Sequence, residues 1–331
     1  MKTSSSVPRR GILVAGTAAA ITGLFAANSA TASPAPAENP GTGPRPKLKF
    51  AADGKFKIVQ FNDTQDGPRT DRRTIELMEK VLDAEKPGFA LINGDVINGS
   101  SQTVTEGKQA INNVVQPMES RGIPWALTFG NHDEDSMPNG TGMDEAKILN
   151  FIRGYEFNAN SKNDKIVGES NSQLLLASSK SAKPVFGIWL LDSNRYAPKT
   201  VGGQDFEGLM SYDWIRPEQI AWYREASIAT ENRYGKVQSL MFFHIPLWEH
   251  NHINTYMGDY YGIELGYGPG TGFGTYGLGG TENHHLRGAR VFELDENKNS
   301  VYAGTRTVFS KDLGIDMGTQ GQPIEGPLPL P

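Results

Sequence analysis

The sequence predicts an α/β fold built on a parallel sheet, with metal-binding side chains gathered at one edge of that sheet. Three apolar runs rich in strand-forming residues, at 56–61, 89–92 and 125–129, are separated by segments with helical periodicity. Polar segments follow the runs, namely Asp63-Thr64-Gln65, Gly94-Asp95 and Gly130-Asn131-His132-Asp133. Because the carboxyl ends of parallel strands meet at one sheet edge, these segments are expected to lie together.

The connections between the three runs predict helices that cross over the sheet. Asp71 is a suitable N-cap for a helix over 71–86, which Pro87 ends, and Ile75, Met78, Val81 and Leu82 form its apolar face. A second helix carries Ile111, Val114, Val115 and Met118 and ends at Gly122, with an internal Pro117 that predicts a kink or an early end. Strand, helix, strand, helix and strand in this order form two right-handed crossover units.

The second half of the chain continues the mixture of strands and helices. Helices are predicted over 144–154 and 217–229, the latter with Pro217 at its first position. Strands are predicted at 173–177, 185–191, 238–243, 290–294 and 301–308. We expect one domain over 50–310 and a flexible tail over 311–331, because the last residues are rich in proline and lack periodicity.

The amino terminus predicts an exported protein. Residues 1–32 combine Arg9 and Arg10, an apolar stretch over 11–27 and the small-residue pattern Ala30-Thr31-Ala32, which is typical of a cleaved signal. The paired arginines favour the twin-arginine export machinery as a partner, and the alternative is a general secretory signal. Residues 33–49 read as a proline-rich linker. No later apolar run is long enough to span a membrane, so the mature chain is expected outside the cytoplasm, in the periplasm, cell wall or medium.

Composition excludes several classes of function. The 331 residues include no cysteine, which rules out disulfides, zinc thiolate sites and cysteine nucleophiles. The net charge is -5 and no basic run occurs, so a nucleic-acid-binding surface is not expected. Any metal chemistry must therefore use oxygen and imidazole ligands.

The polar segments contain the ligand types that a two-metal hydrolytic site needs. Asp95 is predicted to bridge two divalent cations, while Asp63 binds the first and Asn131 the second. The remaining predicted ligands are the histidines that follow the 238–243 strand: His244, His250 and His252. His132 is the candidate general acid, with Asp133 or another carboxylate holding its tautomer.

These residues and their surroundings resemble the calcineurin-like metallophosphoesterases over about residues 50–310. The motifs are Asp-x-x, Gly-Asp, Gly-Asn-His-Asp, a later histidine and His-x-His, with similar text at Phe243-His244-Ile245-Pro246 and Arg287-Gly288-Ala289-Arg290. The chain is most similar to an exported bacterial branch that is akin to plant phosphatases grouped as purple acid phosphatase 29-like. The resemblance implies a four-layer α/β sandwich with a dimetal site at the strand ends.

Two departures from the family pattern affect the site. Gln65 stands where most members have a histidine, so its amide oxygen must replace an imidazole or the first metal loses a ligand. That change favours Mn²⁺, Mg²⁺ or Ca²⁺ over Zn²⁺, and Val96-Ile97-Asn98 lacks the tyrosine that a purple Fe site requires. Only residues 245–249 separate His244 from His250, which is too short for a crossover. Either the second half lacks a strand, or His250 is not the family's ligand.

The predicted activity is that of an exported phosphoesterase. It would hydrolyse phosphomonoesters or phosphodiesters with a hydroxide bound to two divalent metal ions, and a small phosphate ester is the expected partner. Tyr267, Phe273 and Tyr276, in and after a glycine-rich loop, either line the substrate cleft or pack on the surface. The alternative function is a secreted binding protein on the same fold, weak or inactive because of Gln65 and the short link.

Overall fold

Two β-sheets form the centre of the fold. The computed structural model describes residues 45–162, 166–209, 211–247, 257–260, 263–274 and 281–330. The larger sheet has the strand order β12-β11-β1-β2-β3. Its strands are β1 (Lys55–Phe61), β2 (Phe89–Asn93), β3 (Trp125–Thr128), β11 (Gly288–Asp295) and β12 (Tyr302–Phe309). The three strands at the amino-terminal end of the sequence are parallel, whereas β11 runs antiparallel to both β1 and β12.

The two predicted crossover helices are present. Helix α1 (Arg72–Glu85) has the predicted N-cap, since the Asp71 side chain accepts a hydrogen bond from the backbone of Arg73. Helix α2 (Val104–Glu119) contains Pro117 in its last turn. A proline there removes one backbone hydrogen bond without breaking the turns before it, so the helix continues two residues further.

A smaller sheet and short elements complete the chain. The smaller sheet has the order β4-β5-β8 and consists of β4 (Ser172–Ala177), β5 (Pro184–Leu190) and β8 (Gln238–Phe242). The other two α-helices are α3 (Glu145–Ile152) and α4 (Pro217–Tyr234). Two small hairpins were not predicted: β6 (Thr200–Val201) with β7 (Gln204–Asp205), and β9 (Met257–Tyr260) with β10 (Ile263–Gly266). Short 3₁₀ turns occupy Met137–Asn139, Thr281–Leu286 and Ser310–Leu313.

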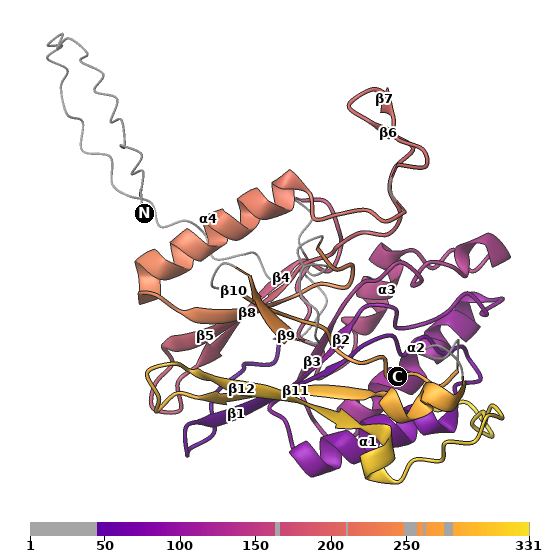
Figure 1. Ribbon diagram of the computed structural model, residues 1–331, viewed down its shortest axis with the longest axis horizontal. Coiled ribbons are helices and arrows are strands. Elements are labelled where there is room, and N and C mark those ends of the chain that lie inside the picture. Colours follow the sequence, from indigo (N-terminus) through magenta and orange to yellow (C-terminus); the bar gives the residue numbers. More distant parts are fainter. Residues whose placement is uncertain are drawn as a thin grey trace, which may run out of the picture. The chain divides into compact units, whose positions relative to one another are not determined.

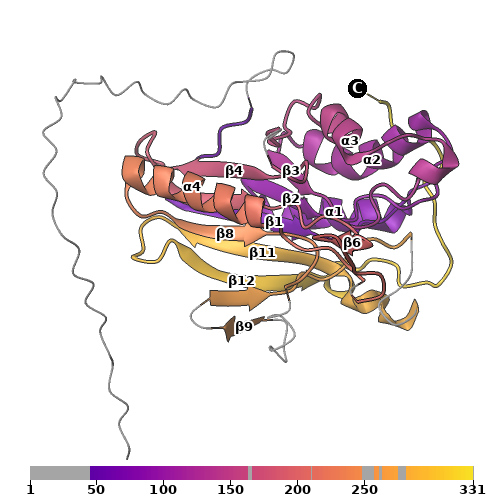
Figure 2. The same ribbon diagram turned by 90° about the horizontal axis from the view of Figure 1, so that it is seen from above.

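The elements form four layers, helix, sheet, sheet and helix. Along β1, Val59 and Phe61 belong to the core that faces α1 and α2, whereas Ile58 belongs to the core shared with the smaller sheet. This alternation is what the period of two along a strand requires when both faces are covered. Helix α4 covers the outer face of the smaller sheet, where Trp189 packs edge-on against Trp222 at 5.7 Å (Figures 1 and 2). The predicted α/β fold and its four layers are therefore confirmed.

The smaller sheet ends in a strand with one neighbour. Within the described ranges β8 pairs only with β5, and it is largely exposed, Met241 included. The alternative that the second half lacks a strand stays a prediction. The link after Leu247, with Trp248, His250 and His252, lies outside the described residues. Among the helices of the described part, none has the length and apolar character that a membrane crossing needs.

Both ends of the predicted domain extend further than expected. Leu48, which was assigned to the linker, is buried, and its carbonyl accepts a hydrogen bond from Ala177. The carboxyl-terminal segment 314–330, which was expected to be a flexible tail, is bound to the first two helices. Gln322 accepts from Arg72 and donates to the Asp71 carboxylate, and Leu328 accepts from the buried amide of Asn112. The segment is held by polar groups on α1 and α2 and by its own Ile315, which is buried in the core, with Met317 packed against that core.

Candidate metal centre

The carboxyl ends of the three parallel strands deliver the predicted side chains to one place. Asp63 follows β1, Asp95 follows β2, and Asn131 follows β3. The first two loops are joined by backbone hydrogen bonds from Asp63 to Gly94 and from Gln65 to Asp95. Asp63, Gln65 and Asp95 have φ values of 48°, 36° and 51°, in the left-handed region that side-chain-bearing residues seldom adopt. Such geometry points to a site whose shape is imposed by the surrounding structure.

Two glycines allow the loops to approach each other. A Cβ atom on Gly94 would lie 2.4 Å from the ring of His244, and this glycine has a φ of +81°. A Cβ atom on Gly130 would lie 2.3 Å from a carboxylate oxygen of Asp95. Both distances are far below van der Waals contact, so no side chain fits at either position. The glycines of Gly94-Asp95 and Gly130-Asn131 are therefore needed to pack the site.

Asp63, Asp95 and His244 form a cluster that could hold a cation. One ligand atom from each of the three lies within 4.8 Å of the others. His244 is oriented by its Nδ1 atom, which is 3.0 Å from the carbonyl of Asn93, and its Nε2 atom is 3.3 Å from Asp95. This fixes the nitrogen that faces the cluster, as carbonyl partners do for metal-binding histidines.

The charges in this cluster are strongly coupled. Burial raises the pKa of Asp63 to about 6, with His244 acting in the opposite direction. Burial would lower the pKa of His244, but its hydrogen bond and charge interaction with Asp95 outweigh burial and raise the pKa to about 9. The same pair lowers the pKa of Asp95 against the effect of its burial. Two carboxylates that compete for one imidazolium are a suitable environment for a divalent cation.

Gln65 supplies a test of whether the residues fit a metal. Its side chain is buried, and its amide nitrogen donates to Asp95 over 2.9 Å. Its amide oxygen is also buried but has no hydrogen-bond partner. A buried acceptor without a partner calls for a missing donor or ion. The two carboxylates and the imidazole form a donor set that fits a hard divalent cation, and the orphaned oxygen belongs to a side chain bound to one of these carboxylates.

Asp133 does not have the role predicted for it. Its carboxylate is almost completely buried and accepts backbone N–H bonds from the loop that carries Asp95 and from the start of its own loop: Asp95 (3.2 Å), Val96 (2.7 Å), Ile97 (3.3 Å) and Gly130 (2.8 Å). Burial and the neighbouring charge of Asp95 raise the pKa of Asp133 to about 7. The catalytic assignment of Asp133 is therefore wrong, and we assign it to holding the Asp95 loop in place.

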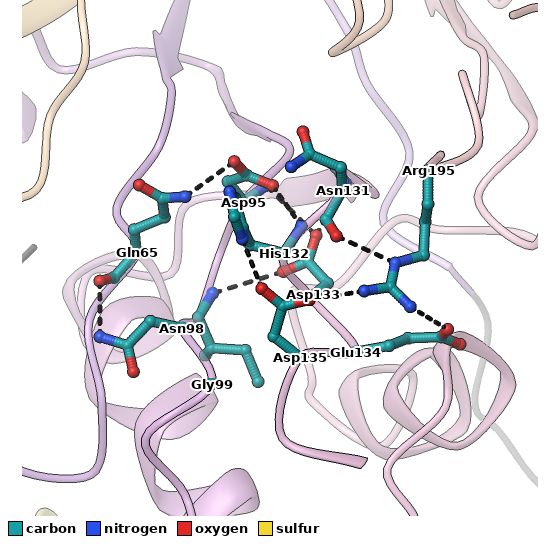
Figure 3. A network of polar contacts seen from close by, with 12 residues as sticks. Gln65, Asp95, Asn98, Gly99, Asn131, His132, Asp133, Glu134, Asp135 and Arg195 are labelled. Atoms are coloured by element: carbon teal, nitrogen blue, oxygen red, sulfur yellow. Dashed lines mark hydrogen bonds and ion pairs between the residues drawn. The ribbon is translucent and has the colours of Figure 1, made fainter. Parts of the chain in front are cut away.

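Asp135 holds the imidazole of His132 instead. Its carboxylate lies 2.5 Å from the Nδ1 atom of His132, and the backbone N–H of His132 donates to Asp95 (Figure 3). Arg195 fixes this arrangement by donating to Asp135 over 2.6 Å, to Glu134 over 2.9 Å and to the carbonyl of Asn131 over 2.9 Å. The role of Arg195 could not be predicted from the sequence, because 60 or more residues separate it from each partner.

The loop that carries Arg195 also contacts the side chain of Asn131. The amide nitrogen of Asn131 donates to the hydroxyl of Tyr196 over 3.2 Å. The two heavy atoms of an amide point in different directions, so this bond turns the oxygen of Asn131, its predicted ligand atom, away from the tyrosine. Tyr196 is thus a further residue at the site that the sequence did not indicate.

The predicted aromatic wall is contradicted in part. Phe273 is buried, with the guanidinium of Arg73 at 4.8 Å from its ring and that of Arg287 at 5.1 Å, so it cannot face a substrate. Its partners are cationic side chains, which apolar patterning does not reveal. Tyr267 is half-buried and remains a prediction. Tyr276 lies outside the described residues, as do the ligand candidates His250 and His252.

The chain is similar to several known phosphoesterases. Residues 56–267 match the family described as "Calcineurin-like phosphoesterase". The chain is 27% identical to "Probable inactive purple acid phosphatase 29" of Arabidopsis thaliana, over 78% of this chain and 82% of the plant protein. It is 29% identical to "Phosphatase DCR2" of Saccharomyces cerevisiae, over 63% of this chain and 38% of the yeast protein. A solved dimetal phosphatase from Danio rerio aligns with a TM-score of 0.46 at 14% identity, covering 77% of this chain and 99% of that one.

Proposed function

Because the chain belongs to the calcineurin-like phosphoesterase family, we propose that it hydrolyses phosphate esters at the centre formed by Asp63, Asp95 and His244. The observation that carries the proposal is the cluster itself, whose ligand atoms lie within 4.8 Å of one another. It is supported by Gln65, which donates to Asp95 and has a buried amide oxygen without a partner. A chain that had lost the site would gain nothing from keeping a buried acceptor without a partner, because that costs about 1 to 3 kcal/mol. The orphan favours a cation as its partner.

The bound ions, Asp95 and His132 would have different roles in the proposed hydrolysis. Divalent ions held there would supply a nucleophilic water at neutral pH and neutralise charge on the phosphoryl oxygens. Asp95 lies between the loops that carry Asp63 and Asn131, which suits a bridging carboxylate. His132 stands next to this group, and Asp135 on its Nδ1 atom leaves Nε2 to carry the proton that the leaving oxygen receives.

The proposal includes two bound ions, with Mn²⁺, Mg²⁺ or Ca²⁺ preferred because the amide of Gln65 is a harder ligand than imidazole. It also includes phosphomonoesters or phosphodiesters as substrates and export through the signal in residues 1–32. The export signal lies outside the described residues, and its support is the pattern of Arg9, Arg10 and the apolar stretch that follows.

A second candidate is a binding protein with little or no activity. It is favoured by the plant relative whose name contains "Probable inactive" and by Gln65 at a position where an imidazole is expected. Such a protein would hold one ion or none. Metal content therefore separates the two candidates.

The test is hydrolysis by the purified chain after chelation and addition of single metals. We expect turnover of an aryl phosphomonoester or diester with Mn²⁺ and a content close to two ions per chain. Asp95→Asn should remove both, while Asp83→Asn, a matched change at an exposed carboxylate on α1, should remove neither. Two bound ions with no turnover of either ester would refute the proposed activity, and a content of one ion or none would favour the binding protein.

A further inference from the structure

Two tyrosines project from the loop that clamps Asn131. In the part of the chain whose side chains are described, Tyr196 and Tyr212 are the aromatic residues in the exposed class, at 47% and 48%. Their ring centroids lie 6.1 Å apart with an interplanar angle of 22°, a stacked arrangement. Exposed, parallel rings form a flat apolar surface that water solvates poorly.

The pair is fixed to the site and is not part of a free loop. Tyr196 and Tyr212 form an antiparallel bridge, flanked by backbone bonds from Ala197 to Ser211 and from Asp213 to Arg195. Directly opposed residues on neighbouring strands present their side chains on the same face. Arg195 then anchors this short ladder through its bonds to Asn131, Glu134 and Asp135. The rings therefore keep their position relative to the candidate metal centre.

The position of the rings suits one part of a substrate. The hydroxyl of Tyr196 touches Asn131, a predicted metal ligand, and Arg195 joins the same loop to Asp135, which holds the candidate general acid His132. The phosphoryl group would occupy the metal centre, and the general acid must face the leaving oxygen. The loop that carries the two rings therefore contacts both a predicted metal ligand and the residue that holds the candidate general acid, so the organic group attached to the leaving oxygen would lie close to this loop.

We propose that Tyr196 and Tyr212 bind the organic part of the ester and favour esters that carry a planar aromatic ring. The inference rests on the proposed function, because it assumes that phosphate binds at the metal centre. Ring stacking adds to the burial of area for an aromatic group but gives much less to an alkyl chain of similar size. Every aromatic ring system has a flat face, so we expect selectivity for the class and not for one ring.

The test measures binding and does not depend on turnover. Benzylphosphonate and ethylphosphonate are titrated calorimetrically into the full chain supplied with Mn²⁺. Tyr212→Leu removes a ring without touching Asn131, and Tyr212→Phe keeps the ring. Tyr234→Leu changes a half-buried tyrosine at the end of α4 and serves as the matched control. Circular dichroism confirms that each variant is folded.

We expect Tyr212→Leu to raise the dissociation constant of benzylphosphonate threefold to tenfold and that of ethylphosphonate less than twofold, with Tyr212→Phe restoring selectivity. Equal changes for both ligands, no change for either, or the same selective loss in Tyr234→Leu would overturn the proposal. If the wild-type chain hydrolyses esters but binds the two phosphonates equally, only the role proposed for Tyr196 and Tyr212 is refuted. If neither phosphonate binds and no ester is hydrolysed, both the proposed function and the role of the two tyrosines are refuted.

Discussion

Removal of the Asp133 carboxylate should mainly lower stability, whereas removal of the Asp135 carboxylate, two residues later, should mainly lower activity. Asp133 is 1% exposed and accepts four backbone N–H bonds, from Asp95, Val96, Ile97 and Gly130. Asp133→Ala would leave those donors buried without an acceptor, at about 1 kcal/mol or more for each, so at least about 4 kcal/mol in total. For a chain of 331 residues that corresponds to a melting temperature lower by at least about 6 °C.

Asp135→Ala is the matched control because its side chain is 30% exposed and its partners are His132 and Arg195. Loss of an exposed ion pair should change stability by about 1 kcal/mol or less. The same change should lower hydrolysis of alkyl phosphates by about tenfold to a hundredfold, because the imidazole of His132 loses its orientation.

Calorimetric melts and hydrolysis rates of both variants test whether Asp133 has a structural role and Asp135 a role in activity. Asp133→Asn, which keeps the volume and one acceptor oxygen, should melt between Asp133→Ala and the wild type. If Asp133→Ala melts with the wild type while losing activity, or if the two alanine variants melt together, Asp133 is not a structural residue and our assignment of the two carboxylates is wrong.

Three further outcomes are expected. Gln65→His should bind Zn²⁺ at least tenfold more tightly than the wild type, since imidazole is a better zinc ligand than an amide oxygen. The affinity is measured by competition with a chelating dye, and an unchanged value would place Gln65 outside the coordination shell. Deleting residues 315–331 should lower the melting temperature at pH 7 by several degrees and expose the amino-terminal end of α1 to hydrogen exchange, and equal exchange in both chains would contradict this. Burial alone would raise the pKa of Asp71, but hydrogen bonds from Arg73 and Gln322 outweigh burial and lower that pKa. The difference in melting temperature between the full and shortened chains should therefore be present at neutral pH and shrink as the pH falls below 3.8, the ordinary pKa of an aspartate. A difference that stays constant across that range would show that Asp71 does not hold the segment.

The sequence was sufficient where local patterns decide the structure. Helix α1 has the predicted N-cap at Asp71 and ends one residue before the expected position, because capping and apolar periodicity are both written within the segment. Asp63 and Asp95 meet as predicted because strand ends in a parallel sheet share an edge, and His244 joins them from the end of β8 in the smaller sheet. Contacts between distant segments could not be read in the same way.

The errors share a physical cause. Asp133 and Asp135 are alike in sequence, and only the three-dimensional path of the loop decides which one meets the backbone and which one meets His132. Arg195 and Tyr196 reach the site from a loop after β5 whose position depends on the packing of two sheets. The carboxyl-terminal segment has few apolar residues, and its order comes from the burial of Ile315 together with hydrogen bonds to groups such as Asn112.

The left-handed backbone at Asp63, Gln65 and Asp95 means that the centre is held in a strained conformation. Each such residue stores roughly 1 to 2 kcal/mol that a glycine would release. An arriving cation therefore meets ligands that are already in position, and its binding energy is not spent on ordering the chain. Selection for thermal stability alone would be expected to replace these three residues with glycine first. The resulting protein would be more stable but would lack the side chains of the metal centre.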